Sequence, residues 1–131
     1  MFADAEAGAI LRQWKDRCGA LGSSLVSRDG LVLFSNLPLA GFADTFAIMC
    51  ATILGAATTA TSELGRGPPH RVTIEEDGGT TIVVPVDPHA LLVTVLGRDA
   101  DLAKVGREVE AFATFLAARA VPSGGPWRRG T

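Results

Sequence analysis

The residues that could perform acid–base or metal chemistry in this chain are few and widely spaced. His70 and His89 each follow a proline at a predicted turn, and neither has a second ligand at metal-binding spacing on a helix. The acidic run from Glu75 to Asp77 cannot form a paired-carboxylate site, because successive strand residues point to opposite faces. We therefore expect no catalytic residue and no metal site.

Motifs for nucleophilic catalysis and for phosphate binding are missing from the sequence as well. The chain has no G-x-S-x-G elbow, no S-x-x-K pair and no G-x-x-x-x-G-K-[ST] loop. Gly19 and Gly22 are better explained as a helix end and a strand entry. The net charge of −2 provides no basic field that could hold nucleic acid. We expect no enzyme activity, no cofactor and no nucleic-acid partner.

The two cysteines and one long uncharged segment indicate the cellular compartment in which we expect the protein. Cys18 and Cys50 lie in apolar helical surroundings, which favours buried, reduced thiols of a cytoplasmic protein over a disulfide or redox pair. Residues 45–62 contain no charged residue. They include few large side chains, and four of their last five residues are Thr or Ser. This composition favours a buried helix over direct membrane insertion.

Arg28, Asp29 and Gly30 stand between two apolar runs, either as a functional loop or as the bend between two strands. Gly30 can adopt a positive φ and Asp29 can bond nearby backbone, so a tight hairpin between strands 24–27 and 31–35 is expected. Arg28 is then expected to extend into solvent.

The remaining elements follow from periodicity and turn residues. A first helix over 5–18, capped by Asp4, and a long helix over 42–64 are expected, with a last helix capped by Asp99. Further strands are expected over the ranges 71–76, 80–86 and 90–96. Strands joined by short turns are antiparallel, so the order α-β-β-α-β-β-β-α predicts an α+β sandwich with one central sheet.

A single domain is expected over residues 1–121. Residues 122–131 are then a flexible C-terminal tail. Within that tail, Trp127, Arg128 and Arg129 have a second interpretation as a short docking peptide.

The long helix carries two apolar sides. Its larger side chains fall in one narrow arc, which we expect to cover the sheet: Phe42, Phe46, Met49, Ile53, Ala60 and Leu64. The second side has mostly small residues, which allow another helix to approach closely.

An open strand edge at 71–76 and an exposed small-residue helix side would both be covered if two copies pair about a two-fold axis. We therefore predict a homodimer. Its predicted interface consists of Ala43, Ala47, Cys50, Leu54, Ala57, Thr61, Arg71, Val72, Thr73, Ile74 and Glu75.

Five segments, in this order, resemble the roadblock family of dynein light chains and bacterial gliding-motility GTPase regulators. They are LVSRDGLVLFS, FAIMCATILGAATTATSELG, TTIVVPV, ALLVTVLG and DADLAKVGREVEAF. The family typically has Asn, or a close relative, where this chain has Asp101. The resemblance covers about residues 10–120 and implies a five-stranded antiparallel sheet between helices, as in profilin-like folds. It also implies homodimerisation through the long helix and the third strand.

The resemblance further implies a non-catalytic regulator or adaptor that binds a small Ras-like GTPase. It leaves open whether the chain accelerates GTP hydrolysis or only scaffolds a signalling or motility complex. Arg66 is the nearest candidate for an arginine finger, although ordering of the GTPase's own switch residues explains acceleration better. The implied partner surface consists of Ile48, Ala51, Thr52, Gly55 and Thr59. The alternative is a small-molecule sensor module of a related fold, with a pocket under the long helix.

Overall fold

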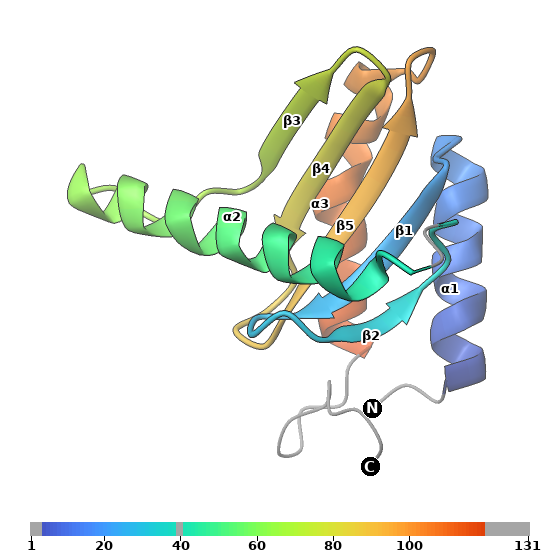
Figure 1. Cartoon of the computed structure of the whole chain (residues 1–131), viewed down its shortest axis with the longest axis horizontal. Coiled ribbons are helices and arrows are strands. Elements are labelled where there is room, and N and C mark those ends of the chain that lie inside the picture. Colours follow the sequence, from blue (N-terminus) through green and yellow to red (C-terminus); the bar gives the residue numbers. More distant parts are fainter. Residues whose placement is uncertain (1–3, 39–40, 120–131) are drawn as a thin grey trace.

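The computed structural model describes residues 4–38 and 41–119, and it places three helices and five strands in the predicted order (Figure 1). Their bounds are α1 Asp4–Cys18, β1 Gly22–Ser27, β2 Val32–Ser35, α2 Ala43–Glu63, β3 Val72–Glu76, β4 Gly79–Pro85, β5 Ala90–Gly97 and α3 Leu102–Arg119. The predicted cap at the side chain of Asp4 and the predicted tail at 122–131 lie outside what the structure describes.

The five strands form one antiparallel sheet in the order β2-β1-β5-β4-β3. Helices α1 and α3 cover one face of this sheet and α2 crosses the other (Figure 1). The α+β class and the single antiparallel sheet between helices are thereby confirmed. The order also leaves β2 and β3 as the two edge strands.

The sheet divides the hydrophobic core into two layers, because alternate residues of each strand face opposite sides. In the layer of α1 and α3, Trp14 stacks on Phe112 with ring centroids 4.5 Å apart. The buried indole nitrogen of Trp14 donates a hydrogen bond of 3.0 Å to the hydroxyl of Thr94. In the layer of α2, small helix residues pack on branched strand residues such as Val83 and Val93.

The two cysteines lie in different core layers. Cys18 belongs to the layer of α1 and α3, and Cys50 belongs to the layer of α2. Both are buried free thiols, as predicted, and the intervening sheet prevents a disulfide between them. Burial raises the pKa of both thiols, and it raises that of Cys50 to about 11.

The segment Arg28, Asp29 and Gly30 is the bend of the first hairpin, as its turn chemistry predicts. Gly30 has φ +96°, and its N–H donates to the carbonyl of Ser27 at 3.0 Å. The hydroxyl of Ser27 donates to the carboxylate of Asp29. Arg28 is exposed, as expected, but its guanidinium also donates to the carbonyl of Asp87 at 3.0 and 3.1 Å, which ties this bend to the β4–β5 turn.

The cap of the last helix differs by two residues from its predicted position. The carboxylate of Asp101 accepts a hydrogen bond of 3.0 Å from the N–H of Lys104, three residues later. This is the geometry of an N-cap, and α3 accordingly begins at Leu102. Asp99 was the predicted cap, and it precedes this position by two residues.

Candidate interaction surface

Helix α2 packs on the sheet with its small-residue side. Ala47, Cys50 and Leu54 are each 1% exposed, and they contact the layer built on β1, β4 and β5. The expectation that these three residues are exposed in one copy is therefore wrong, because the chain's own sheet already covers them. Among the described helices, α2 is the one long and apolar enough to cross a membrane, but this side of it packs within the chain.

The expected sheet-facing stripe of α2 is wrong for three of its large members, whereas Phe46 is half-buried and packs against the α2 core layer. Phe42, Met49 and Leu64 are 67%, 52% and 66% exposed. The sheet itself explains the reversal, since its α2 face already carries Val26, Val83, Leu91 and Val93. Small helix residues let the α2 axis come close to these branched side chains without a void, whereas large residues would hold it away.

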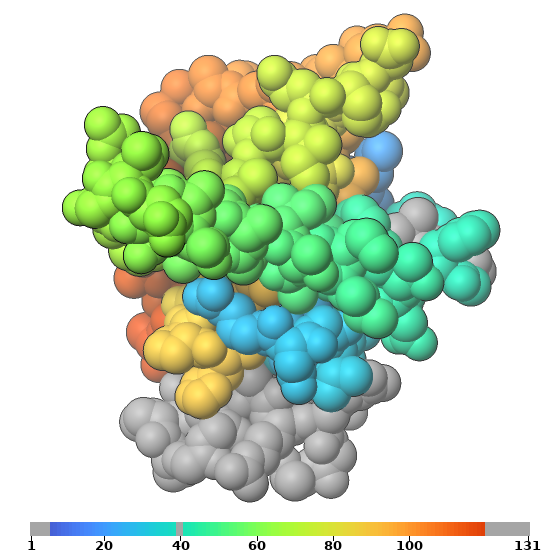
Figure 2. All heavy atoms as spheres, turned by 60° about the vertical axis from the view of Figure 1, so that its left-hand side comes forward, coloured from blue at the N-terminus to red at the C-terminus, as the bar shows by residue number. Residues whose placement is uncertain are grey.

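The outer side of α2 presents an unusual amount of exposed apolar surface. Among the residues that the structure describes, eight large hydrophobic side chains are exposed, and four of them lie on α2 or at its two caps: Phe42, Ile48, Met49 and Leu64. Helix α2 runs across the front of the space-filling view (Figure 2). Large apolar side chains that stay exposed along the whole length of a helix favour contact with a partner, so the outer side of α2 is a candidate interaction surface.

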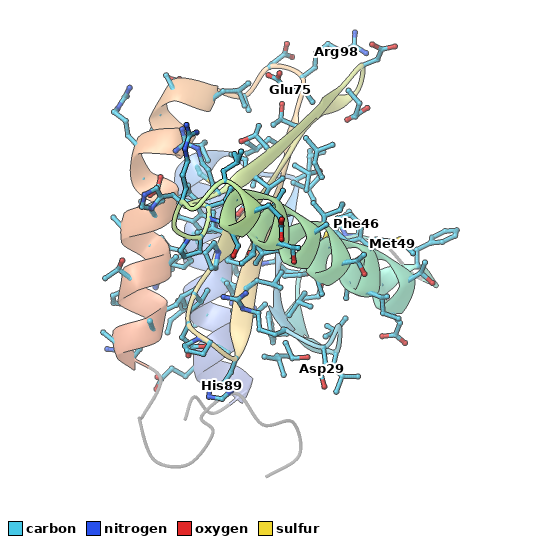
Figure 3. The ribbon with its side chains drawn as sticks, turned by 90° about the vertical axis from the view of Figure 1, so that its left-hand side faces the viewer. Asp29, Phe46, Met49, Glu75, His89 and Arg98 are labelled. Atoms are coloured by element: carbon cyan, nitrogen blue, oxygen red, sulfur yellow. The ribbon has the colours of Figure 1, made fainter. Side chains whose placement is uncertain are left out.

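The two flanks of α2 face different neighbours. Ile48 lies against the β1–β2 bend, where a Cβ atom built on Gly30 would meet the Ile48 Cα at 3.2 Å. Phe46 and Met49 lie together on the opposite flank, away from Asp29 (Figure 3). Because successive helix residues are about 100° apart, the neighbouring side chains of Ile48 and Met49 can meet different partners.

The C-terminal part of α2 extends past the outer edge of the sheet at β3 (Figure 1). Ala57 and Thr61 continue the small-residue side beyond Leu54, but they are only half-buried. Strand β3 pairs with β4 on one side, and its other edge has no strand partner among the residues that the structure describes. An overhanging helix and an open strand edge thus lie next to each other.

The charged residues around α2 and β3 are mostly acidic. Asp44 and Glu63 lie near the two ends of α2, and Glu75 and Glu76 lie on β3, all of them exposed. Arg66, also exposed, lies just after the C-cap of α2, with its N–H bonded to the carbonyl of Thr61 at 3.0 Å. A partner with a basic rim would complement this distribution.

The residues predicted as the partner surface lie on the outer part of α2, with one exception. Ile48, Thr52, Gly55 and Thr59 are exposed, whereas Ala51 is half-buried and packs against the α2 core layer. Apart from Ile48, the large apolar residues of this surface were assigned to the core by their helical arc. The signal that could have corrected this assignment is the number of branched residues on the strands. These residues fill the α2 core layer, so it has little room for large helix side chains.

The fold and this surface define a class of small α+β proteins: an antiparallel sheet with an open edge at β3, crossed by a helix that is apolar on both sides. The chain belongs to the Roadblock/LC7 family, since the model of the Roadblock/LC7 domain matches residues 7–96. The recognition made from the five sequence segments is thereby confirmed.

Similar proteins include archaeal chains and bacterial gliding-motility proteins. An uncharacterized protein of Methanocaldococcus jannaschii is 35% identical over 75 residues, which cover 57% of this chain and 66% of that protein. The chain thus spans just under two thirds of the length of that curated relative.

Two solved structures extend the similarity over most of the chain. The gliding protein MglB from Thermus thermophilus is 26% identical, with a TM-score of 0.80 over 90% of this chain and 91% of that one. An MglB with a tetrameric arrangement is 25% identical, with the same TM-score and the same coverage. The chain therefore has a Roadblock fold of the MglB kind, which is consistent with a GTPase-regulating or adaptor role.

Proposed function

We propose that this chain is a non-catalytic homodimeric regulator or adaptor that binds a small Ras-like GTPase through the outer side of α2. The observation that carries the proposal is the exposed apolar surface of α2 beside the open edge of β3. The likeness to an MglB that has a tetrameric arrangement supports self-association.

The dimer is supported by two features that one symmetric pairing would cover together. Pairing β3 with β3 of a second copy satisfies the unpaired edge and joins the two sheets. The overhanging part of α2, with Ala57 and Thr61 on its underside, then lies over the second sheet. In this dimer the exposed flank of α2 that bears Met49 contacts the second copy. The sequence had predicted that the small-residue side of α2 would make this contact.

The GTPase surface is proposed on the flank of α2 that bears Ile48. Ile48 is 49% exposed and rests on the β1–β2 bend, which Arg28 ties to the β4–β5 turn. A rigid support of this kind suits a surface that must order mobile switch segments of a partner. Acceleration of GTP hydrolysis would then come from positioning the GTPase's own residues rather than from Arg66.

The test uses the purified chain and Ras-like GTPases loaded with GDP or with a non-hydrolysable GTP analogue. We expect binding to differ between the two nucleotide states, and Ile48→Glu to weaken it at least about tenfold, a loss of about 1.4 kcal/mol. Leu21→Glu is the matched control, because Leu21 is equally exposed but lies away from α2. Absence of binding in both nucleotide states would refute the proposal.

The sensor alternative requires a ligand pocket beneath α2. The underside of α2 is packed against the sheet through Ala47, Cys50 and Leu54. Two hollows among the described residues lie elsewhere, one between α1 and α3 and one beside Pro68 and Pro69. We therefore favour the GTPase regulator.

A further inference from the structure

The face of the molecule opposite α2 contains a groove between α1 and α3, with a volume of about 330 Å³. We call it the α1–α3 groove; its lining includes Gln13, Trp14 and Arg17 from α1 and Ala111, Phe112 and Phe115 from α3. No acidic residue of the described chain lines it. The sheet separates this groove from the α2 surface, so what binds in it is independent of the proposed function.

Three aromatic rings form a stack along this groove. Phe112 stacks on both Trp14 and Phe115, with ring centroids 4.5 and 6.0 Å apart. An arginine lies over each of the other two rings, Arg17 over Trp14 and Arg119 over Phe115, and each guanidinium carbon is 5.5 Å from the ring centroid. We call these five side chains the arginine–aromatic ladder.

Phe115 is the ring of the ladder that a partner can contact. It is 44% exposed, whereas Trp14 and Phe112 are 1% and 7% exposed and belong to the core. An exposed phenyl ring beside a groove is a favourable contact for another aromatic side chain. Gln13, which is also exposed, has a side-chain amide that can bond the backbone of a bound segment.

The end of the groove at Arg17 is positively charged. Arg17 is exposed and has no ion-pair partner among the residues that the structure describes. The ammonium group of Lys104 lies 3.3 Å from the backbone carbonyl oxygen of Arg17 and adds a second cation. Glu108 is an acidic neighbour, whose charge helps to raise the pKa of Cys18. Its Oε2 atom is buried, however, and it does not line the groove.

The arginine at the other end of the ladder is held by a single exposed ion pair. The guanidinium of Arg119 lies 3.4 Å from the carboxylate of Glu6, and the two side chains are 48% and 47% exposed. Exposed ion pairs of this kind contribute little, so a carboxylate from a partner can replace Glu6. A guanidinium that is stacked on a ring keeps its N–H edge free for such a carboxylate, and its fixed position lowers the entropic cost of binding.

We propose that the α1–α3 groove docks an acidic segment of a partner protein, with one aromatic side chain of this segment as its anchor. The anchor packs on Phe115, and carboxylates on either side of it pair with Arg17 and Arg119. Charge complementarity selects this partner, because the groove presents guanidinium groups and no carboxylate in its lining. The ring spacings correspond to about three extended residues, so we expect the acidic residues two or three positions from the anchor.

The test uses isothermal titration calorimetry of the full chain with a synthetic peptide that has this pattern, acetyl-Glu-Asp-Ser-Trp-Ser-Asp-Glu-amide. Two matched peptides serve as controls, one with Lys at every acidic position and one with Ser in place of Trp. We expect both controls to bind at least about tenfold more weakly than the acidic aromatic peptide. Binding of the acidic aromatic peptide should also weaken as the salt concentration rises.

Variants of the chain then locate the site. Phe115→Ser should weaken peptide binding at least about tenfold. Phe42→Ser, an exposed phenylalanine on the opposite face, should leave it unchanged. Arg17→Gln should weaken binding about threefold or more and reduce its salt dependence. Arg107→Gln is the control for this charge, because Arg107 is an exposed arginine of α3 that does not line the groove.

Four results would overturn the proposal. One is no binding of the acidic aromatic peptide, or binding no tighter than that of its basic counterpart. Another is binding that Phe115→Ser does not change. A lower molecular mass of Phe115→Ser in analytical ultracentrifugation would make a second copy of the chain the occupant. Tighter peptide binding by Trp127→Ser would instead make the chain's own Trp127 a competitor for the groove.

Discussion

At the scale of single residues, backbone positions at strand ends decide whether the sheet can form. Gly79 begins β4 opposite Gly97 and next to the β3–β4 turn, and its φ of +154° disfavours any residue with a side chain. A Cβ atom at this position would lie 2.0 Å from the carbonyl oxygen of Leu96. Since backbone rather than a movable side chain is in the way, the neighbouring strand would have to shift.

We predict that Gly79→Ala destabilises the protein by about 3 kcal/mol or more, through backbone strain and loss of β4–β5 pairing. Gly78→Ala is the control, because a Cβ atom there meets only the flexible carboxylate of Glu76, at 3.1 Å or more. Urea unfolding monitored by circular dichroism measures both. Equal stability of the two variants would show that β4 can move without cost.

Cys50 gives a prediction for pH dependence. Its folded-state pKa of about 11 lies above the ordinary value of 9.0, so the thiol stabilises the fold fully below pH 9. Between pH 9 and about 11 the unfolded state loses the proton first. The free energy of unfolding should then fall by about 1.4 kcal/mol per pH unit.

The measurement is the free energy of unfolding of the unmodified chain and of Cys50→Ala from pH 8 to pH 11. The difference between the two should shrink or reverse above pH 9, because Cys50→Ala lacks this titration. A constant difference over the whole range would contradict the prediction.

At the scale of elements, the sheet surface that α2 packs against decides which side of the helix is buried, because both sides of the helix are apolar. Both of its sides are apolar, and the sheet takes the side whose residues are small. The side that remains outward carries Ile48 and Met49 among threonines, and it ends beyond the edge of β3. The helix therefore supplies part of the core and the candidate interaction surface at once.

We predict that Ala47→Glu prevents folding of the single chain, because it buries a carboxylate without a partner between α2 and the sheet. Thr52→Glu, on the exposed side of the same helix, should change stability by no more than about 0.5 kcal/mol. Thermal unfolding followed by circular dichroism distinguishes them. A cooperative transition of Ala47→Glu near that of the unmodified chain would show that the buried side has been assigned wrongly.

At the scale of the whole molecule, the sheet separates two faces with different tasks. The face of α2 and β3 is acidic and apolar, and it is the proposed site of dimerisation and GTPase binding. The face of α1 and α3 contains a groove lined largely by aromatic side chains of these two helices. A variant on one face can thus be tested without disturbing the other.

Met49→Glu should dissociate the proposed dimer and leave the monomer folded, because the Met49 side chain is 52% exposed within one chain. A charge buried in the helix–helix contact should raise the dimer Kd at least about tenfold. Analytical ultracentrifugation over a dilution series gives the constant. Leu21→Glu, at 54% exposure away from α2, should leave the Kd unchanged. A persistent Met49→Glu dimer would place the interface elsewhere.

Periodicity and turn residues predicted the number, order and type of the elements, because local geometry decides them. Alternation placed Val72 and Ile74 on one side of β3, and the helical spacing of Ile10, Trp14 and Cys18 identified the buried side of α1. The cap of α3 was displaced by two residues, since Asp99 and Asp101 have the same propensity. Of the candidate surface, Ile48 was identified and Met49 was not.

The sequence by itself determined an antiparallel α+β fold, the hairpin at Gly30 and membership of the roadblock family, since each depends on residue order and local backbone preference. Only the tertiary structure decided which apolar side of α2 is buried. Both sides satisfy the helical period, and the choice depends on the volume that Val26, Val83 and Val93 already occupy on the sheet. The same is true of Arg28, whose acceptor at Asp87 lies 59 residues away along the chain. Packing between distant segments has no local signature.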